Sequence, residues 1–141
     1  MKIYRVFFGL CALVLALFTY WQFNDPDAAF WGSMYGVAAV LAGMAAFGKF
    51  SVPLLLAEAI YCLFGFVYKY PSSVSTWVKE EWMQKDLSMK TYSMEQARES
   101  FGMLIVAVVM LLAVAAAYYE NRKAAASSGF RTADKTRAVA R

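Results

Sequence analysis

Four long apolar stretches separated by short polar segments dominate the chain. They cover residues 6–24, 28–48, 50–68 and 100–119, and only the third contains a charged residue, Glu58. A helix needs about 20 apolar residues to cross the hydrocarbon core of a bilayer, and each stretch is close to that length. The pattern therefore predicts an all-α integral membrane protein with four transmembrane helices in an antiparallel bundle.

The turn residues between the stretches set the expected bounds. Helices are expected at about 3–23, 28–48, 52–69 and 94–120. Pro26 and Pro53 are placed where the first turn of a helix accepts proline. Ser93 to Gln96 has the form of a capping box and is expected to begin the last helix. Together they form one transmembrane domain, residues 1–120. Residues 121–141 lack an apolar period, so they are expected to form a basic, mobile cytoplasmic tail.

The longest polar stretch, between the third and fourth transmembrane helices, contains a further amphipathic segment. At helical spacing Val74, Trp77, Val78 and Trp82 share one face. Such a face suits the boundary between headgroups and acyl chains. A short interfacial helix is therefore expected at about 73–84.

Small residues recur along one stripe of the second helix, at Gly32, Gly36 and Gly43. In lipid, small side chains let another helix approach closely, so that dispersion contacts hold the pair together. The stripe predicts a helix-packing face. Its neighbour is either another helix of this chain or a helix of a second protein.

Composition limits the chemistry that the protein can perform. The chain of 141 residues is 61% hydrophobic and 17% charged, and it contains no histidine, the usual general base and metal ligand. Cys11 and Cys62 fall inside apolar stretches without metal-ligand spacing. We therefore expect no catalytic activity, no metal and no cofactor.

The basic residues indicate an orientation. With both termini in the cytoplasm, that side is the more basic one, as the positive-inside rule requires. The residues assigned to it are Lys2, Arg5, Lys49, Arg122, Lys123, Arg131, Lys135, Arg137 and Arg141. The expected location is the bacterial cytoplasmic (inner) membrane, with lipids as partners. Because topology explains these charges, no nucleic-acid partner is expected.

Glu58 is the one ionisable residue deep inside a predicted span. A carboxylate near the bilayer centre is costly unless it is protonated, hydrated or paired, so such residues often mark function. Tyr61, one turn on, is the nearest candidate partner in the sequence. Either Glu58 bonds locally within its helix, or it meets a group on another subunit, a lipid or a cation.

A second polar group is expected on the non-cytoplasmic side. The turn after the first helix supplies Asp25 and Asp27, and the start of the last helix supplies Glu95, Arg98 and Glu99. Arg98 could reach either aspartate, which would form an ion-paired latch across the mouth of the bundle. A divalent-cation site made of the same oxygen ligands is the alternative.

Two segments resemble the transmembrane protein 220 family, which comprises small four-helix membrane proteins. One is FTYWQFNDPD, residues 18–27, followed by Trp31 and Tyr35; the other is EQARESFG, residues 95–102. The resemblance runs from the first helix to the fourth and implies a four-helix fold in a membrane. The family has no established biochemical activity, so the resemblance implies none.

These features favour a non-catalytic structural or accessory subunit of a larger membrane complex, of the respiratory or photosynthetic kind. Other subunits would bind through faces of the second and third helices. The alternative is a small transporter, or a lipid- or ion-binding membrane protein, that uses Glu58 and the acidic mouth.

Overall fold

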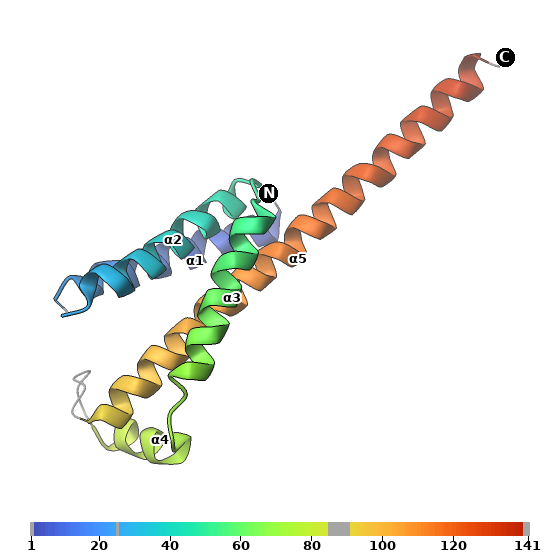
Figure 1. Ribbon diagram of the computed structural model, residues 1–141. Coiled ribbons are helices and arrows are strands. Elements are labelled where there is room, and N and C mark those ends of the chain that lie inside the picture. Colours follow the sequence, from blue (N-terminus) through green and yellow to red (C-terminus); the bar gives the residue numbers. More distant parts are fainter. Residues whose placement is uncertain (1, 25, 85–90, 140–141) are drawn as a thin grey trace.

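The structure is a computed structural model that describes residues 2–24, 26–84 and 91–139, with side chains described to residue 128. Every regular element in these residues is helical (Figure 1). The all-α class is therefore confirmed. The elements are α1 (Ile3–Trp21), the 3-10 turn η1 (Gln22–Asn24), α2 (Ala28–Ala46), α3 (Val52–Tyr68), α4 (Val74–Met83) and α5 (Tyr92–Val139).

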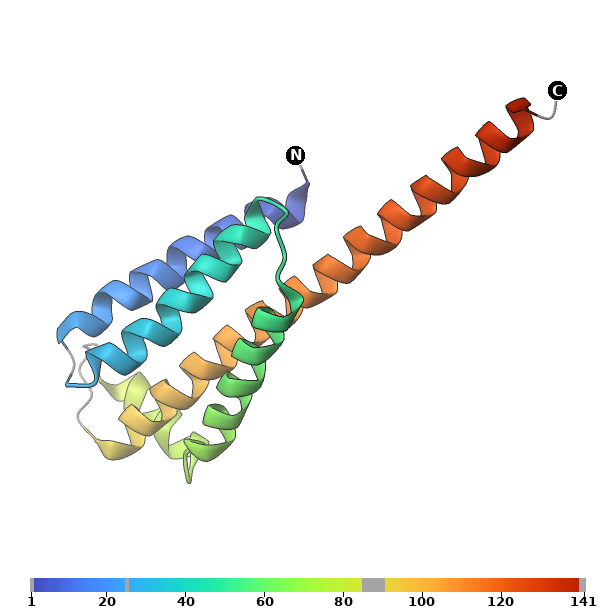
Figure 2. The same ribbon diagram turned by 45° about the horizontal axis from the view of Figure 1, so that its top comes forward.

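The helices form two pairs. α1 packs mainly against α2, and α3 packs mainly against α5, while fewer contacts join α2 to α5 (Figures 1 and 2). α5 is the most buried of the long apolar helices and α1 the least. The core lies where α2 and α3 meet α5, around Ala38, Ala42, Ala59, Val106 and Met110. Small side chains at many of these positions allow the close helix approach that packing in lipid requires.

Among the described residues, three helices are long and apolar enough to cross a membrane: α1 continued through η1, α2, and the apolar part of α5. α3 is apolar but has 17 residues, a length of about 26 Å. A hydrocarbon core is about 30 Å thick, so α3 matches most of it, and modest thinning of the bilayer accommodates the difference. The arrangement is that of a helical membrane protein.

Gly48 ends α2 and turns the chain toward α3. Its φ of +76° is in the left-handed region, its N–H donates to the carbonyl of Ala45, and the N–H of Lys49 donates to the carbonyl of Met44. This is a Schellman ending, which satisfies the last helical carbonyls. The guanidinium of Arg5 lies where a side chain at residue 48 would begin.

The start of α5 differs from the predicted capping box. Thr91 supplies the cap, since its hydroxyl accepts from the N–H of Met94 at 3.3 Å and its carbonyl accepts from the N–H of Glu95 at 3.2 Å. Ser93 is already inside the helix. The prediction of Ser93 as the cap is wrong, because the helical hydrogen bonds begin two residues earlier.

The far end of α5 also differs from expectation. The sequence pattern predicts that the last helix ends near residue 120, whereas α5 continues to Val139 and projects beyond the bundle (Figure 2). Alanine, lysine and arginine are good helix formers, and extending an existing helix avoids the cost of nucleation. Mobility of residues 121–141 stays a prediction.

Candidate functional site

Glu58 lies half-buried in the middle of α3, and its described polar contact is within the same helix. Its Oε1 accepts a hydrogen bond from the thiol of Cys62 at 3.9 Å. Tyr61, the partner suggested by the sequence, instead places its ring 6.4 Å from that of Phe30 on α2. A thiol is a weak donor. Glu58 therefore has a local partner, and that partner satisfies little of its hydrogen-bonding capacity.

The three glycines of α2 have different surroundings. A Cβ on Gly36 would lie 3.7 Å from Cγ2 of Thr19, and one on Gly43 would lie 3.9 Å from Cβ of Ala12, so both face α1. A Cβ on Gly32 would meet nothing within 4 Å. The stripe thus packs against α1 of the same chain at Gly36 and Gly43, whereas no atom lies close to Gly32.

A network of ion pairs lies at the end of the bundle where α3 ends and α5 begins. The Arg98 guanidinium donates to both carboxylate oxygens of Glu81 on α4, from Nε at 2.7 Å and from Nη2 at 2.9 Å. The indole N–H of Trp77 donates to Glu81 at 3.0 Å. Lys69, just after α3, donates to Glu99 at 2.7 Å. These contacts join α3 and α4 to α5.

Electrostatics keep these groups charged. The hydrogen bond from Arg98 lowers the pKa of Glu81, and the hydrogen bond to Glu99 raises the pKa of Lys69. The ring of Trp77 stacks on Phe101 with centroids 5.1 Å apart and an interplanar angle of 18°. α4 is therefore attached to α5 by an aromatic stack beside a bidentate ion pair.

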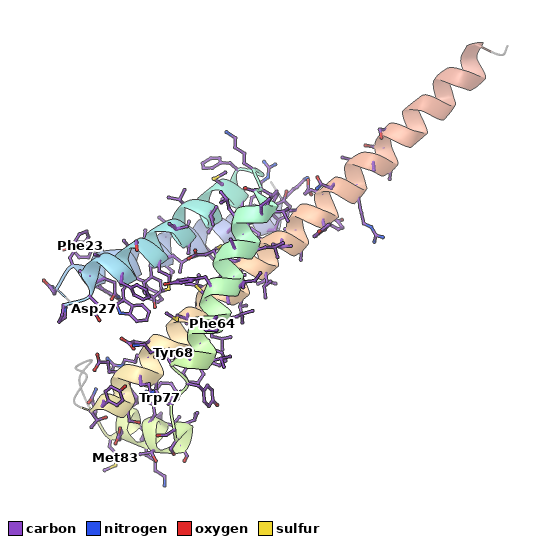
Figure 3. All side chains as sticks on the ribbon, viewed as in Figure 1. Phe23, Asp27, Phe64, Tyr68, Trp77 and Met83 are labelled. Carbon is purple, nitrogen blue, oxygen red and sulfur yellow. The ribbon has the colours of Figure 1, made fainter. Side chains whose placement is uncertain are left out.

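The structure describes four of the five residues of the predicted latch across the bundle mouth, namely Asp27, Glu95, Arg98 and Glu99. Asp27 is exposed at the start of α2, at the tip of the α1–α2 hairpin, and Trp77 lies at the end of the other pair of helices (Figure 3). Glu95 is exposed. Asp25 lies outside the described residues. In the structure Arg98 pairs with Glu81 and Glu99 pairs with Lys69, and neither of these partners is among the residues predicted for the latch.

The comparison with known families agrees with this arrangement. A family model described as "Transmembrane family 220, helix" matches residues 14–115. The chain belongs to this family. No curated protein and no solved structure matches the chain. The match extends from the middle of α1 into the apolar part of α5 and so includes Glu58, the three glycines of α2 and the ion pairs of Arg98 and Lys69.

In this member of the transmembrane 220 family, two glycines outside α2 mark the tightest helix approaches. A Cβ on Gly65 of α3 would collide with the side chain of Met103, and one on Gly102 of α5 would collide with the hydroxyl of Tyr35. Isolated glycines without a repeat carry no signal in the sequence. Only the contact partners identify them.

A third polar group lies at the opposite end of the bundle, outside the residues matched by the family model. Lys2 forms an ion pair with Glu120 of α5, and its Nζ lies 5.7 Å from the centroid of the Tyr4 ring. This contact places the start of α1 beside the end of the apolar part of α5. Within the described ranges, no group of three or more cysteine, aspartate or glutamate side chains is arranged to hold a metal ion.

Proposed function

We propose that this protein is a non-catalytic structural or accessory subunit of a larger membrane complex, with respiratory and photosynthetic complexes as the first classes to test. The observation that carries the proposal is Glu58. Its carboxyl group lies in the middle of a membrane-spanning helix, half-buried, with a thiol as its described partner. A carboxyl group at that depth is stabilised by a stronger donor, which a neighbouring subunit can provide.

The docking surface in this proposal consists of the outer faces of α2 and α3. Both helices carry large apolar side chains that the rest of the chain leaves exposed, among them Phe30 and Val40 on α2 and Ile60 and Phe64 on α3. Gly32, with open space beside it, lies on α2 as well. A helix of another subunit can approach closely there, because a glycine presents no side chain.

The alternative of a transporter with an acidic mouth has less support. Arg98 neutralises Glu81 and Lys69 neutralises Glu99, so these carboxylates connect helices to one another. The same pairing supports a role without catalysis, because charged groups that hold one another are poor general acids or bases.

For location, we propose the cytoplasmic membrane of a bacterium, with both termini in the cytoplasm. The contact between Lys2 and Glu120 supports termini that leave the bundle at the same end. Labelling of single cysteines introduced at Lys2 and Arg122, in a chain without Cys11 and Cys62, tests it. Both positions should react only after the inner membrane is made permeable, and reaction of either one in intact cells refutes the orientation.

The test of the subunit role is Glu58→Gln, with Glu95→Gln as the matched control. Both replace a carboxyl group by an amide of nearly the same size, but Glu95 is exposed at the start of α5. Native complexes extracted in a mild detergent should retain their partner subunits with the control and lose them with Glu58→Gln. Equal recovery of the same partners with both variants, or a wild-type protein that is always monomeric, contradicts the proposal.

A further inference from the structure

An apolar pocket of about 310 Å³ opens between α1 and α5 at the end of the bundle where the chain begins. Its lining comes from Ile3, Tyr4, Phe7 and Phe8 of α1 and from Leu112 and Ala116 of α5. The pocket is shallow and open on its outer side, so an elongated ligand can enter it from the surrounding lipid. Because the lining is almost entirely hydrocarbon and aromatic, the pocket suits an acyl chain better than water.

Polar groups of both signs lie beside this pocket. Lys2 and Glu120 form their ion pair between the same two helices, and Tyr4 belongs to the pocket lining and also lies beneath Lys2. The hydroxyl of Tyr4 and Oε1 of Glu120 make no hydrogen bond of ordinary geometry among the described residues, and both lie next to each other beside the Lys2 ammonium. The Lys2 ammonium, the Tyr4 hydroxyl and the Glu120 carboxylate thus form one cluster of donors and acceptors beside the pocket, and a headgroup with charges of both signs is complementary to it.

We propose that this pocket binds a phospholipid with a primary ammonium headgroup, namely phosphatidylethanolamine. One acyl chain fills the apolar pocket. The ammonium donates to Oε1 of Glu120, while the phosphate accepts from the Lys2 ammonium and from the Tyr4 hydroxyl. The resulting charges alternate in sign, which is favourable at a membrane surface where solvent screening is reduced.

The headgroup chemistry distinguishes this lipid from the common alternatives. A choline headgroup has a quaternary ammonium without an N–H to donate, so it leaves Glu120 without its hydrogen bond. A phosphatidylglycerol headgroup can donate a hydroxyl to Glu120, but it has no positive charge to offset the carboxylate, so its hydrogen bond there lacks the ion-pair component. Selectivity for the primary ammonium therefore depends on Glu120, whereas binding of the acyl chain depends on the pocket.

The experiment uses the full chain, purified in a mild detergent and exposed to phosphatidylethanolamine, phosphatidylcholine or phosphatidylglycerol with identical acyl chains. Native mass spectrometry counts the lipids retained. Wild-type protein should retain one phosphatidylethanolamine about tenfold better than either other lipid, the factor expected for one charge-assisted hydrogen bond. Glu120→Gln should abolish this preference, and the control Glu95→Gln should leave it unchanged.

A second variant tests the pocket itself. Ala116→Trp fills the space with an indole and should reduce retention of all three lipids, with the helix content checked by circular dichroism. Equal retention of the three lipids by wild-type protein, or an unchanged preference in Glu120→Gln, overturns the proposal. Preferential retention of phosphatidylglycerol also overturns it, because that result indicates attraction to a basic surface without recognition of the headgroup. None of these outcomes depends on the subunit role proposed for Glu58.

Discussion

Gly102 offers the sharpest test of how α2 and α5 are held together. The structure places the hydroxyl of Tyr35 where a Cβ on residue 102 would lie, and the next atom of that ring, Cζ, would be 3.4 Å from the Cβ. Tyr35 cannot move aside freely, since it is buried and its ring packs edge-on against Phe18 with centroids 5.5 Å apart. Gly102→Ala should therefore push against a rigid aromatic side chain.

Two opposing effects set the magnitude. Overpacking a tight core costs about 1–3 kcal/mol, while replacing glycine by alanine inside a helix stabilises it by up to about 1 kcal/mol. The expected net change is a destabilisation of about 0–2 kcal/mol. In a Tyr35→Phe background the hydroxyl is gone and Cζ is at ordinary van der Waals distance. There Gly102→Ala should stabilise the protein by up to about 1 kcal/mol.

The assay is a double-mutant cycle on the free energy of unfolding, measured by titration with a denaturing detergent in mixed micelles and followed by circular dichroism. The expected coupling energy between residues 35 and 102 is about 1–3 kcal/mol. Gly32→Ala is the control, because a Cβ there meets nothing within 4 Å and its effect should be the same in both backgrounds. If the change caused by Gly102→Ala is equal in both backgrounds, within about 0.5 kcal/mol, the Tyr35 hydroxyl does not restrict residue 102.

Three further substitutions test other contacts. Ser100 is fully buried, and its hydroxyl donates to the carbonyl of Phe66 at 3.1 Å. Ser100→Ala removes this hydrogen bond and should lower the free energy of unfolding by about 0.5–2 kcal/mol. No measurable change in that free energy would contradict the hydrogen bond. Because Arg98 lowers the pKa of Glu81 in the folded protein, their pair stabilises fully above about pH 5 and progressively less as the pH falls through the lowered pKa. Melting temperatures should thus fall more steeply with acid in wild-type protein than in Arg98→Gln, and parallel curves would exclude the pair as the cause. Gly48→Ala places a residue with a side chain at a φ of +76° and directs that side chain toward the Arg5 guanidinium. Thermal unfolding should report a loss of about 1–2 kcal/mol in the free energy of unfolding. An unchanged melting temperature would argue against this turn.

Much of the fold is predictable because lipid imposes one strong rule. A backbone in hydrocarbon must satisfy its own hydrogen bonds, so apolar stretches of this length become helices. The expected starts at residues 3, 28 and 52 agree with α1, α2 and α3, and the expected ends are within two residues of those observed. Outside the membrane the rule does not apply. There the last helix continues well past its expected end, because helix propensity and an existing helical turn suffice to extend it.

The candidate site residues divide in the same way. Glu58 is recognisable as a candidate from the sequence, because a single carboxylate in an apolar stretch is unusual, whichever helices surround it. The partners of Arg98 and Glu99 are not recognisable, because each charged side chain has several oppositely charged candidates at similar depth. The choice of Glu81 for Arg98 depends on α4 folding back so that Trp77 stacks on Phe101.

The helical class, the membrane location and the order of the spans therefore follow from the amino-acid sequence alone, since they depend on the length and polarity of each segment. The packing of the helices in three dimensions is needed to know which glycines are in tight contact, which ion pairs form, and that a pocket lies between α1 and α5 beside Lys2 and Glu120. These features depend on the distance and rotation between helices. Distance and rotation follow from side-chain packing between segments far apart in the chain, which no local pattern encodes.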